Sequence, residues 1–364
     1  MELLCSLANT LQIVFILGLL NLYYPANLSA LFSYLKYSNF DNPVTEMPSS
    51  FALKSIDIID SPISDEFEKL GFSSTNFMKN SLDIIFMLFF IGLLMLFIYL
   101  LFSCMKTKSN WFAKKVKKLD TSLRYQSSTR IIVEMSMNLS VSVLINIFYG
   151  KAEGAIGICS YILAVALMGL MIFLAIYVTV FPLYYAEAHT NPEKFETHSF
   201  LFAEFKTSNP KCFQYYSYFL IRRMLMAGVI VCLRQRSLLQ LICIVILVYK
   251  MCKYQLVYRS FKYQVTNFLC CVNELFFLAF SLILFVFKNP GNPATIQVFG
   301  FITTGFLAIF FILNWGVIFP LKVRDVCSYI KKKCRKKTHE VREKGNNLSR
   351  IILCGLKDSG KTIS

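Results

Sequence analysis

Eight long apolar runs divide this chain and are separated by shorter polar segments. The runs cover approximately residues 3–24, 81–103, 131–149, 155–181, 218–233, 237–253, 266–287 and 296–320. Several of them reach the roughly 20 residues that an α-helix needs to cross a hydrocarbon core of about 30 Å. The pattern therefore predicts an all-α polytopic integral membrane protein with about eight transmembrane helices.

Basic residues between the runs are distributed unevenly over the two sides of the predicted membrane. If Met1 starts in the cytosol, the cytosolic side holds 30 of the 38 Lys and Arg residues, and the opposite side holds eight. The cytosolic segments in this count are 104–130, 182–217, 250–264, everything after 320, and Arg222 with Arg223. Because insertion favours Lys and Arg in cytoplasmic loops, we expect both termini in the cytosol, with the protein in the plasma membrane or an endomembrane.

The composition is typical of a membrane protein, and the placement of the positive charge favours anionic lipid over nucleic acid as its partner. A mean hydropathy of +0.54 with 56% apolar residues is ordinary for a helical bundle in lipid and extreme for a soluble chain. The net charge of +17 would otherwise point to nucleic acid, but it is placed in the inner loops and the tail. We therefore expect the lipid bilayer and anionic lipids at the cytosolic face as partners, no nucleic acid, and leave a homo-oligomer open.

The cysteines and histidines are not spaced for disulfides or for a metal ion. None of the twelve Cys falls in 25–80, the one sizeable outer segment, so no extracellular disulfide framework is expected. Cys270 and Cys271 are adjacent, and the three His have no ligand-like neighbours along the chain. The sequence therefore predicts no metal site and no cofactor.

The apolar runs and the charges divide the chain into five parts. These are a first transmembrane helix (1–24), an extracellular or lumenal segment (25–80), a seven-helix bundle (81–320), a basic cytosolic tail (321–349) and an incomplete P-loop-like end (350–364). The first run has no basic residue before Lys36, which favours a retained helix over a cleaved signal peptide.

Two connecting segments show helical periodicity of their own. The stretch that begins at Phe51 is too apolar for a solvated linker and predicts one or two short helices over 51–70. In the loop 104–130, apolar residues recur at helical spacing among lysines, and Trp111 stands beside them. This predicts an interfacial amphipathic helix over 110–123, which either anchors the loop or couples it to gating.

Polar residues inside the apolar runs need an explanation, because an ionisable side chain in hydrocarbon costs about 2.5–3.5 kcal/mol on insertion scales. The third run carries Glu134, Asn138, Ser142 and Asn146 at successive four-residue steps. Each step turns about 400°, so the stripe stays close to one face of a helix and is expected to face other helices or water. The remaining intramembrane polar candidates are Arg222, Arg223, Asn267, Asn273 and Glu274.

The predicted orientation places several of these groups at related depths. The third, fifth and seventh helices all enter from the cytosol. The groups expected in the inner leaflet are therefore Glu134, Arg222, Arg223 and Asn267, with Glu274 deeper, about 12 Å along its helix. Glu134 and Glu274 are therefore expected to face the bundle interior beside Arg222, Arg223 or Asn267. Such pairs either fix the order of the helices or line an ion or proton pathway entered from the cytosol.

The order of these polar residues resembles the multi-pass module of fungal TRP-like (transient-receptor-potential-like) proteins and the C-terminal region of large ciliate surface proteins. The matching points over about 40–320 are Arg222-Arg223, Gln240, Tyr258-Arg259, Asn267 and Asn273-Glu274. The resemblance implies a cation-channel-like or lipid-linked transport role. The sequence has no carbonyl filter of the potassium-channel type and no Arg at every third position as in a voltage sensor. A pore helix between the last two spans would have to fit in Lys288–Thr295, so a tetrameric pore-loop channel is disfavoured.

The end of the chain matches the spacing of a P-loop. Gly355, Gly360, Lys361 and Thr362 follow the strand-like Ile351-Ile352-Leu353, and the segment resembles the opening of small GTPases. The helix that should hold the phosphates would begin where the sequence stops, so we expect no nucleotide hydrolysis and no enzyme activity in this chain. The match is either chance or the start of a GTPase-like domain, for which the protein would be a receptor-like membrane scaffold or anchor.

A cluster of basic residues lies about ten positions beyond the last run. It consists of Lys331, Lys332, Lys333, Arg335, Lys336 and Lys337. Each such charge near an anionic leaflet is worth about 1 kcal/mol, so these residues are expected to contact acidic lipid. A stop-transfer signal accounts for the same cluster.

The charge distribution predicts that 25–80 is extracellular or lumenal and that 104–130 and the tail are cytosolic. In a Cys-free background, a Cys placed at Ser64 should react with an impermeant thiol reagent in intact cells, and a Cys placed at Ser122 should not. Labelling at Ser122 with protection at Ser64 would reverse the orientation.

Overall fold

A computed structural model describes residues 2–35, 61–105, 128–188, 205–206, 210–289, 291–320, 323–324 and 327. The expected interfacial helix 110–123, the basic cluster 331–337 and the P-loop-like end 355–362 lie outside these residues. Contacts divide the chain into a unit Met1–Leu307 and a unit Ala308–Ser364. The architecture described below is that of the first unit.

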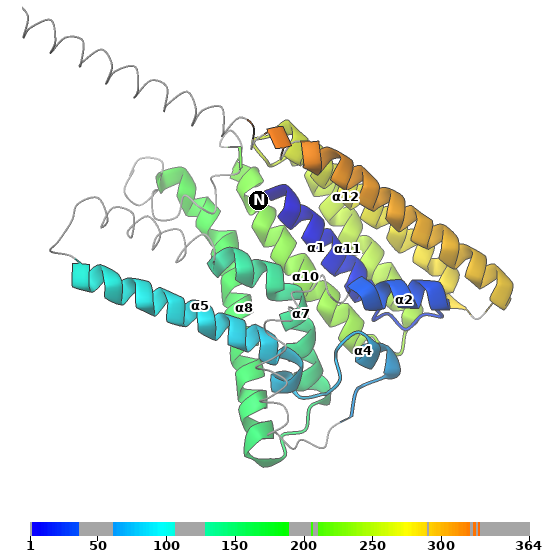
Figure 1. Cartoon of the computed structure of the whole chain (residues 1–364), viewed down its shortest axis with the longest axis horizontal. Helices are drawn as coiled ribbons and strands as arrows, with labels where there is room; N and C mark the ends of the chain where they lie inside the picture. Colours follow the sequence, from blue (N-terminus) through cyan, green and yellow to red (C-terminus); the bar gives the residue numbers. More distant parts are fainter. Residues whose placement is uncertain are drawn as a thin grey trace, which may run out of the picture. The chain divides into compact units, whose positions relative to one another are not determined.

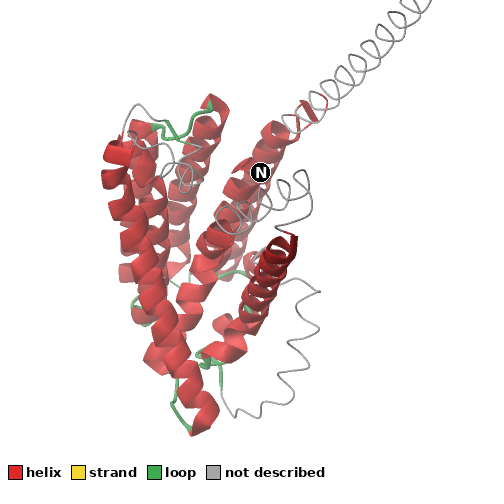
Figure 2. Ribbon diagram, turned by 90° about the vertical axis from the view of Figure 1, so that its left-hand side faces the viewer, coloured by secondary structure: helices red, strands yellow, loops and turns green. Residues whose placement is uncertain are grey.

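Helices make up almost all of the described structure (Figures 1 and 2). In chain order they are α1 (Glu2–Leu17), α2 (Ala26–Leu35), α4 (Asp65–Lys69), α5 (Phe77–Met105), α7 (Ser128–Tyr149), α8 (Gly154–Ala188), η4 (Pro210–Gln214), α10 (Tyr215–Cys232), α11 (Ser237–Tyr258), α12 (Gln264–Ile283) and η5 (Leu284–Lys288). A further helix runs over Pro293–Pro320. The described residues form no strand, and one isolated bridge joins Phe205 to Phe261.

Within the described residues, five helices are long and apolar enough to cross a membrane. They cover Gly154–Val180, Lys211–Cys232, Ser237–Tyr258, Gln264–Lys288 and Pro293–Pro320. The all-α membrane class is thereby confirmed, whereas the count of eight spans stays a prediction. The other three apolar runs are also helical: α1 has 16 residues, α5 has 29, and α7 has 22 with its apolar part at Met135–Tyr149.

The first helix is shorter than the apolar run that predicts it. The sequence predicts a helix to residue 24, but α1 ends at Leu17, and its 16 residues are about 24 Å long at 1.5 Å per residue. Beyond it, the phenol of Tyr24 donates a hydrogen bond of 2.6 Å to the carbonyl of Leu17. The amide of Tyr23 donates to the carbonyl of Phe287 at 2.8 Å. These bonds satisfy backbone groups that the helix end leaves exposed, so the chain turns there despite its apolar side chains.

α1 lies inside the bundle rather than at its edge. It packs against α12, α7 and α2 (Figure 1), and Gln12 to Leu17 are at most 3% exposed at six consecutive positions. Burial at every position means that neighbours surround the helix on all sides, because consecutive residues point in directions about 100° apart. The outer positions of α5 and α8, in contrast, expose large apolar side chains such as Phe97 and Phe173. These surfaces suit contact with lipid.

Aromatic side chains from around η4 and from the turn before α12 form a buried cluster. Phe205 is fully buried and packs against Phe213, Phe261 and Cys270. Its ring lies 5.2 Å from that of Phe261 and 5.7 Å from that of Tyr215. Phe205, which belongs to the segment 182–217, thus packs against the helices of the bundle.

The described parts of the segment 25–80, residues 25–35 and 61–80, also fold onto the bundle. α4 falls inside 51–70, where one or two short helices were expected, and residues 51–60 are not described. α2 was not expected, although its residues Leu28, Phe32 and Leu35 are buried. The helix Pro293–Pro320 crosses the start of α2 at Gly300, where a Cβ would overlap the ring of Pro25 and lie 2.6 Å from Asn27 Oδ1.

This close approach predicts that Gly300→Leu lowers the melting temperature in detergent, because the added side chain must displace Pro25 and Asn27. Gly305→Leu is the matched control on the same helix, since a Cβ there would meet nothing within 4 Å. An unchanged melting temperature in Gly300→Leu, measured beside that control, would contradict the crossing.

Candidate functional site

Two adjacent arginines on α10 form the centre of the polar interior. Arg222 and Arg223 are 4% and 0% exposed. Neighbouring positions on a helix point about 100° apart, so the two guanidinium groups face different helices. Each must find polar partners, because a charge in a membrane interior is costly.

Arg222 pairs with Glu274 of α12. Its Nη1 lies 2.5 Å from Glu274 Oε2, and the two side chains are 5% and 13% exposed. This is one of the pairings that the depth argument predicts from the sequence. The ion pair links α10 to α12, and removing one partner would leave the other charge buried without compensation.

Arg223 faces the other side of α10, toward α1 and α7. Its Nη2 donates to Gln12 Oε1 at 2.8 Å, and its Nη1 donates to Ser136 Oγ at 3.5 Å. The guanidinium carbon also lies 4.4 Å from the centre of the Phe219 ring, one turn earlier on α10. At this distance the ring face attracts a cation. Arg223 thus joins three helices through polar contacts and one aromatic contact.

The predicted polar stripe on α7 is buried for most of its length. Ser142 and Asn146 are 1% and 2% exposed, and Asn138 is half-buried. Three oxygens of the stripe have no hydrogen-bond partner among the described residues: Asn138 Oδ1, Ser142 Oγ and Asn146 Oδ1. Glu134 lies on α7, but its side chain is outside the described residues, so its expected pairing stays a prediction.

One end of this stripe is tied to the neighbouring helices. Asn146 Nδ2 donates to the carbonyl of Thr75 at 3.1 Å and to Ser160 Oγ of α8 at 3.4 Å. Ser160 Oγ in turn donates to Asn76 Oδ1 at 2.8 Å, just before α5 begins. These bonds fix α7 and α8 to the start of α5.

Asn267 stabilises a backbone turn. From the sequence it was expected to be a possible partner of Glu134 or Glu274 in the bundle interior. Its Oδ1 accepts from the Phe261 amide at 2.9 Å, and its Nδ2 donates to the Phe261 carbonyl at 2.7 Å. The side chain therefore acts as a backbone substitute for the turn between α11 and α12. Asn273 is 4% exposed on α12 beside Glu274, where the sequence places it.

Three glutamines belong to the polar interior, and the sequence analysis gave none of them a role there. Gln12 binds Arg223, and Gln240 donates from Nε2 to the Ile230 carbonyl at 3.0 Å. Gln255 of α11 is fully buried, and neither atom of its amide has a partner among the described residues. An amide inside an apolar run was the available signal, because burying an amide without a hydrogen bond costs about 2–7 kcal/mol.

Comparisons with protein-family models, with curated proteins and with solved structures find no match to this chain.

The geometry predicts energetic coupling between Arg222 and Glu274. Arg222→Gln and Glu274→Gln should each lower the melting temperature in detergent, because each leaves one buried charge without its partner. Breaking a buried pair typically costs about 3–5 kcal/mol. The double variant should lose less than the sum of the single losses, because both charges are then absent. Lys253→Gln, an exposed cation on α11, is the control. Strictly additive losses would argue against the pair.

Proposed function

We propose that this protein is a subunit of a TRP-like cation channel or transporter. In this proposal α1, α5 and α7 join the five long apolar helices in a bundle of eight transmembrane helices, with both termini in the cytosol. The proposal rests on the polar interior of the bundle rather than on fold likeness. Its central observation is the row of buried oxygens on α7.

The residues of this row are evenly spaced along the helix axis. Asn138, Ser142 and Asn146 follow one another at four-residue steps, about 6 Å apart along the axis and about 12 Å in total. Each contributes an oxygen without a hydrogen-bond partner among the described residues. Ser81 of α5 is fully buried and adds a fourth such oxygen. It lies one turn beyond Phe77, which packs against Leu139 and Val143 of α7.

Buried oxygens of this kind favour water or a cation as their partner. An unsatisfied polar group in a protein interior costs about 1–3 kcal/mol, so natural structures rarely retain several on one helix face without a use. Amide and hydroxyl oxygens can replace part of the hydration shell of a cation, as the carbonyl rings of ion filters do. A row of them on α7 supports passage of cations rather than of anions.

The ion pair and the Arg223 contacts have a supporting role in this proposal. They hold α10 against α12 on one side and against α1 and α7 on the other. The helix that carries the oxygen row is therefore fixed in the bundle by a charged contact. The alternative function, a scaffold for a GTPase-like domain, gains no support from the described residues, because its motif lies outside them.

Ion flux from liposomes that contain the purified full chain tests the proposal. The unaltered protein should pass Na⁺, K⁺ or Ca²⁺ above the level of empty liposomes. Asn138→Leu and Ser142→Ala should lower that flux by about five- to a hundredfold, since each removed oxygen is worth about 1–3 kcal/mol to a passing cation. Both variants should keep the melting temperature of the unaltered protein, which separates lost transport from lost folding.

Ser140→Ala is the matched control for these variants. Ser140 is also on α7 and 1% exposed, but its hydroxyl already donates to the Ser136 carbonyl at 2.6 Å. Its removal should leave the flux unchanged. No flux from the unaltered protein for any of the three cations, or equal losses in Ser140→Ala and Ser142→Ala, would refute the proposed path.

A further inference from the structure

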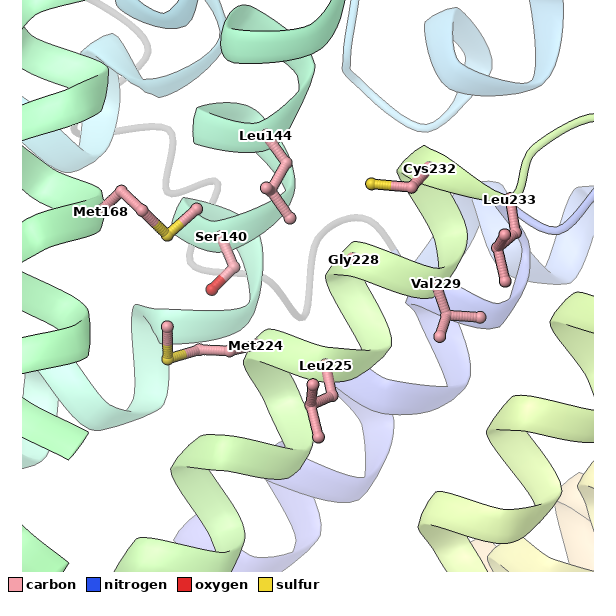
Figure 3. Close-up of a pocket in the computed structure, with 9 residues that line it drawn as sticks. All are labelled: Ser140, Leu144, Met168, Met224, Leu225, Gly228, Val229, Cys232 and Leu233. Atoms are coloured by element: carbon pink, nitrogen blue, oxygen red, sulfur yellow. The ribbon is translucent and has the colours of Figure 1, made fainter. Parts of the chain in front are cut away.

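A cavity of about 330 Å³ lies where α7, α8 and α10 meet (Figure 3). Leu144 of α7 and Met168 of α8 form one side of it. The other side is made by α10, from Met224 to Leu233 at its end. Those ten residues rise by about 14 Å, so the cavity follows α10 along roughly half of a hydrocarbon core. Its volume is at the lower end of pockets that hold small organic ligands, about 300–1,000 Å³.

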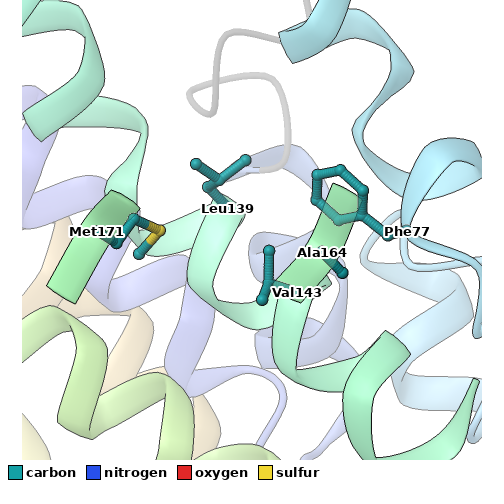
Figure 4. Packing of buried hydrophobic residues seen from close by; sticks show 5 residues of the cluster. All are labelled: Phe77, Leu139, Val143, Ala164 and Met171. Carbon is teal, nitrogen blue, oxygen red and sulfur yellow. The ribbon is translucent and has the colours of Figure 1, made fainter. Parts of the chain in front are cut away.

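The cavity exists because α10 carries Gly228 at its centre. A Cβ at Gly228 would meet nothing within 4 Å, so the neighbouring helices do not close over the missing side chain. The adjoining seam between α5, α7 and α8 is filled instead by Phe77, Leu139, Val143, Ala164 and Met171 (Figure 4). The same α7 thus packs tightly on one face and leaves a hollow on another.

The lining is suited to hydrocarbon. Ser140 supplies the one hydroxyl among the lining side chains, and its proton is already donated to the Ser136 carbonyl. The remaining groups are Leu, Val and Met side chains, the Cys232 thiol and the Gly228 backbone. Met side chains adapt to irregular apolar ligands. A polar ligand would find almost no partners here, whereas a hydrocarbon chain would gain packing contacts.

The cavity opens toward the surface that faces lipid. Leu225 and Cys232 line it and are themselves exposed, Leu225 to 49%. Both belong to Lys211–Cys232, one of the five helices long enough to span a membrane. Because that surface is bathed by bilayer lipid, the molecule with access to the opening is a membrane lipid rather than a solute from water.

Two arginines lie next to the end of the cavity that Leu233 lines. Arg234 and Arg236 follow Leu233 in the turn between α10 and α11, and neither forms an ion pair within the described part of the chain. Guanidinium groups bind phosphate oxygens through paired hydrogen bonds. A lipid with its phosphate at this turn would have an acyl chain beside the opening of the cavity.

We propose that this cavity is a phospholipid site, in which one acyl chain fills the space beside Gly228 and the phosphate is held by Arg234 and Arg236. The site is separate from the oxygen row on α7 and does not depend on ion transport. Sterols are disfavoured, because they have no phosphate to use the two arginines.

The test uses the full chain in lipid nanodiscs with a trace of phosphatidylcholine that carries a photoreactive diazirine in one acyl chain. After illumination, mass spectrometry compares the label on the α7 residues Ser140 and Leu144 with the label on exposed α8 residues such as Phe173. Label on α7 reports a chain inside the cavity, and label on α8 reports surrounding lipid. Gly228→Leu should abolish the α7 label and keep the α8 label.

Two further variants keep the result interpretable. Gly169→Leu, at an exposed α8 position where a Cβ also meets nothing within 4 Å, should keep both labels. Leu225→Trp should lower the α7 label by obstructing the opening, and so serves if Gly228→Leu does not fold. Replacing both Arg234 and Arg236 by Gln should weaken the α7 label by about tenfold or more, because the lipid phosphate loses hydrogen bonds from two charged donors.

Three results would overturn the proposal. The first is no α7 label in the unaltered protein, and the second is an α7 label that survives Gly228→Leu. The third is an α7 label obtained with a photoreactive sterol and not with the phospholipid. An unchanged label in the double arginine variant would overturn the assignment of the phosphate to the α10–α11 turn.

Discussion

Burial of two adjacent guanidinium groups on α10 is the constraint on which the arrangement of the bundle depends. Each guanidinium group carries five N–H donors, so the fold must bring hydrogen-bond acceptors to both of them. Because Arg222 and Arg223 point about 100° apart, one helix cannot serve both. Glu274 brings α12 to one side, while Gln12 and Ser136 bring α1 and α7 to the other. α10 is thereby fixed to three helices that are far apart in sequence.

The position of α1 follows from the same constraint. Gln12 is the polar group that α1 offers in its buried half beside Arg223, and the surrounding residues are apolar on every face. A helix that is buried all round does not need to contact lipid over its whole length, which is consistent with its end at Leu17. The chain that follows it is held by bonds to Phe287 and to the turn near Arg234. The N-terminal run is therefore an internal part of the bundle rather than a peripheral anchor.

α7 has three faces with different properties, and the two proposals use two of them. Leu139 and Val143 fill the seam toward α5 and α8. Asn138, Ser142 and Asn146 carry buried oxygens along a second face, where hydration or a cation would satisfy them. Ser140 and Leu144 border the apolar cavity beside α10. Polar and apolar faces can coexist on one helix because successive residues face different neighbours.

The sequence alone determined the class of the protein, since runs of about 20 apolar residues have few uses outside a bilayer. It also indicated that the arginines of α10 and the polar stripe of α7 face inward, because lipid excludes them, and it gave Arg222 as one of three possible partners of Glu274. The tertiary structure decided which helix serves Arg223, that Asn267 binds the Phe261 backbone, that α1 ends at Leu17, and that Gly228 borders a cavity. The physical reason is that the periodicity of polar and apolar residues indicates which face of a helix is buried. The hydrogen-bond partner of a side chain and the position of a cavity depend instead on how helices far apart in sequence pack together.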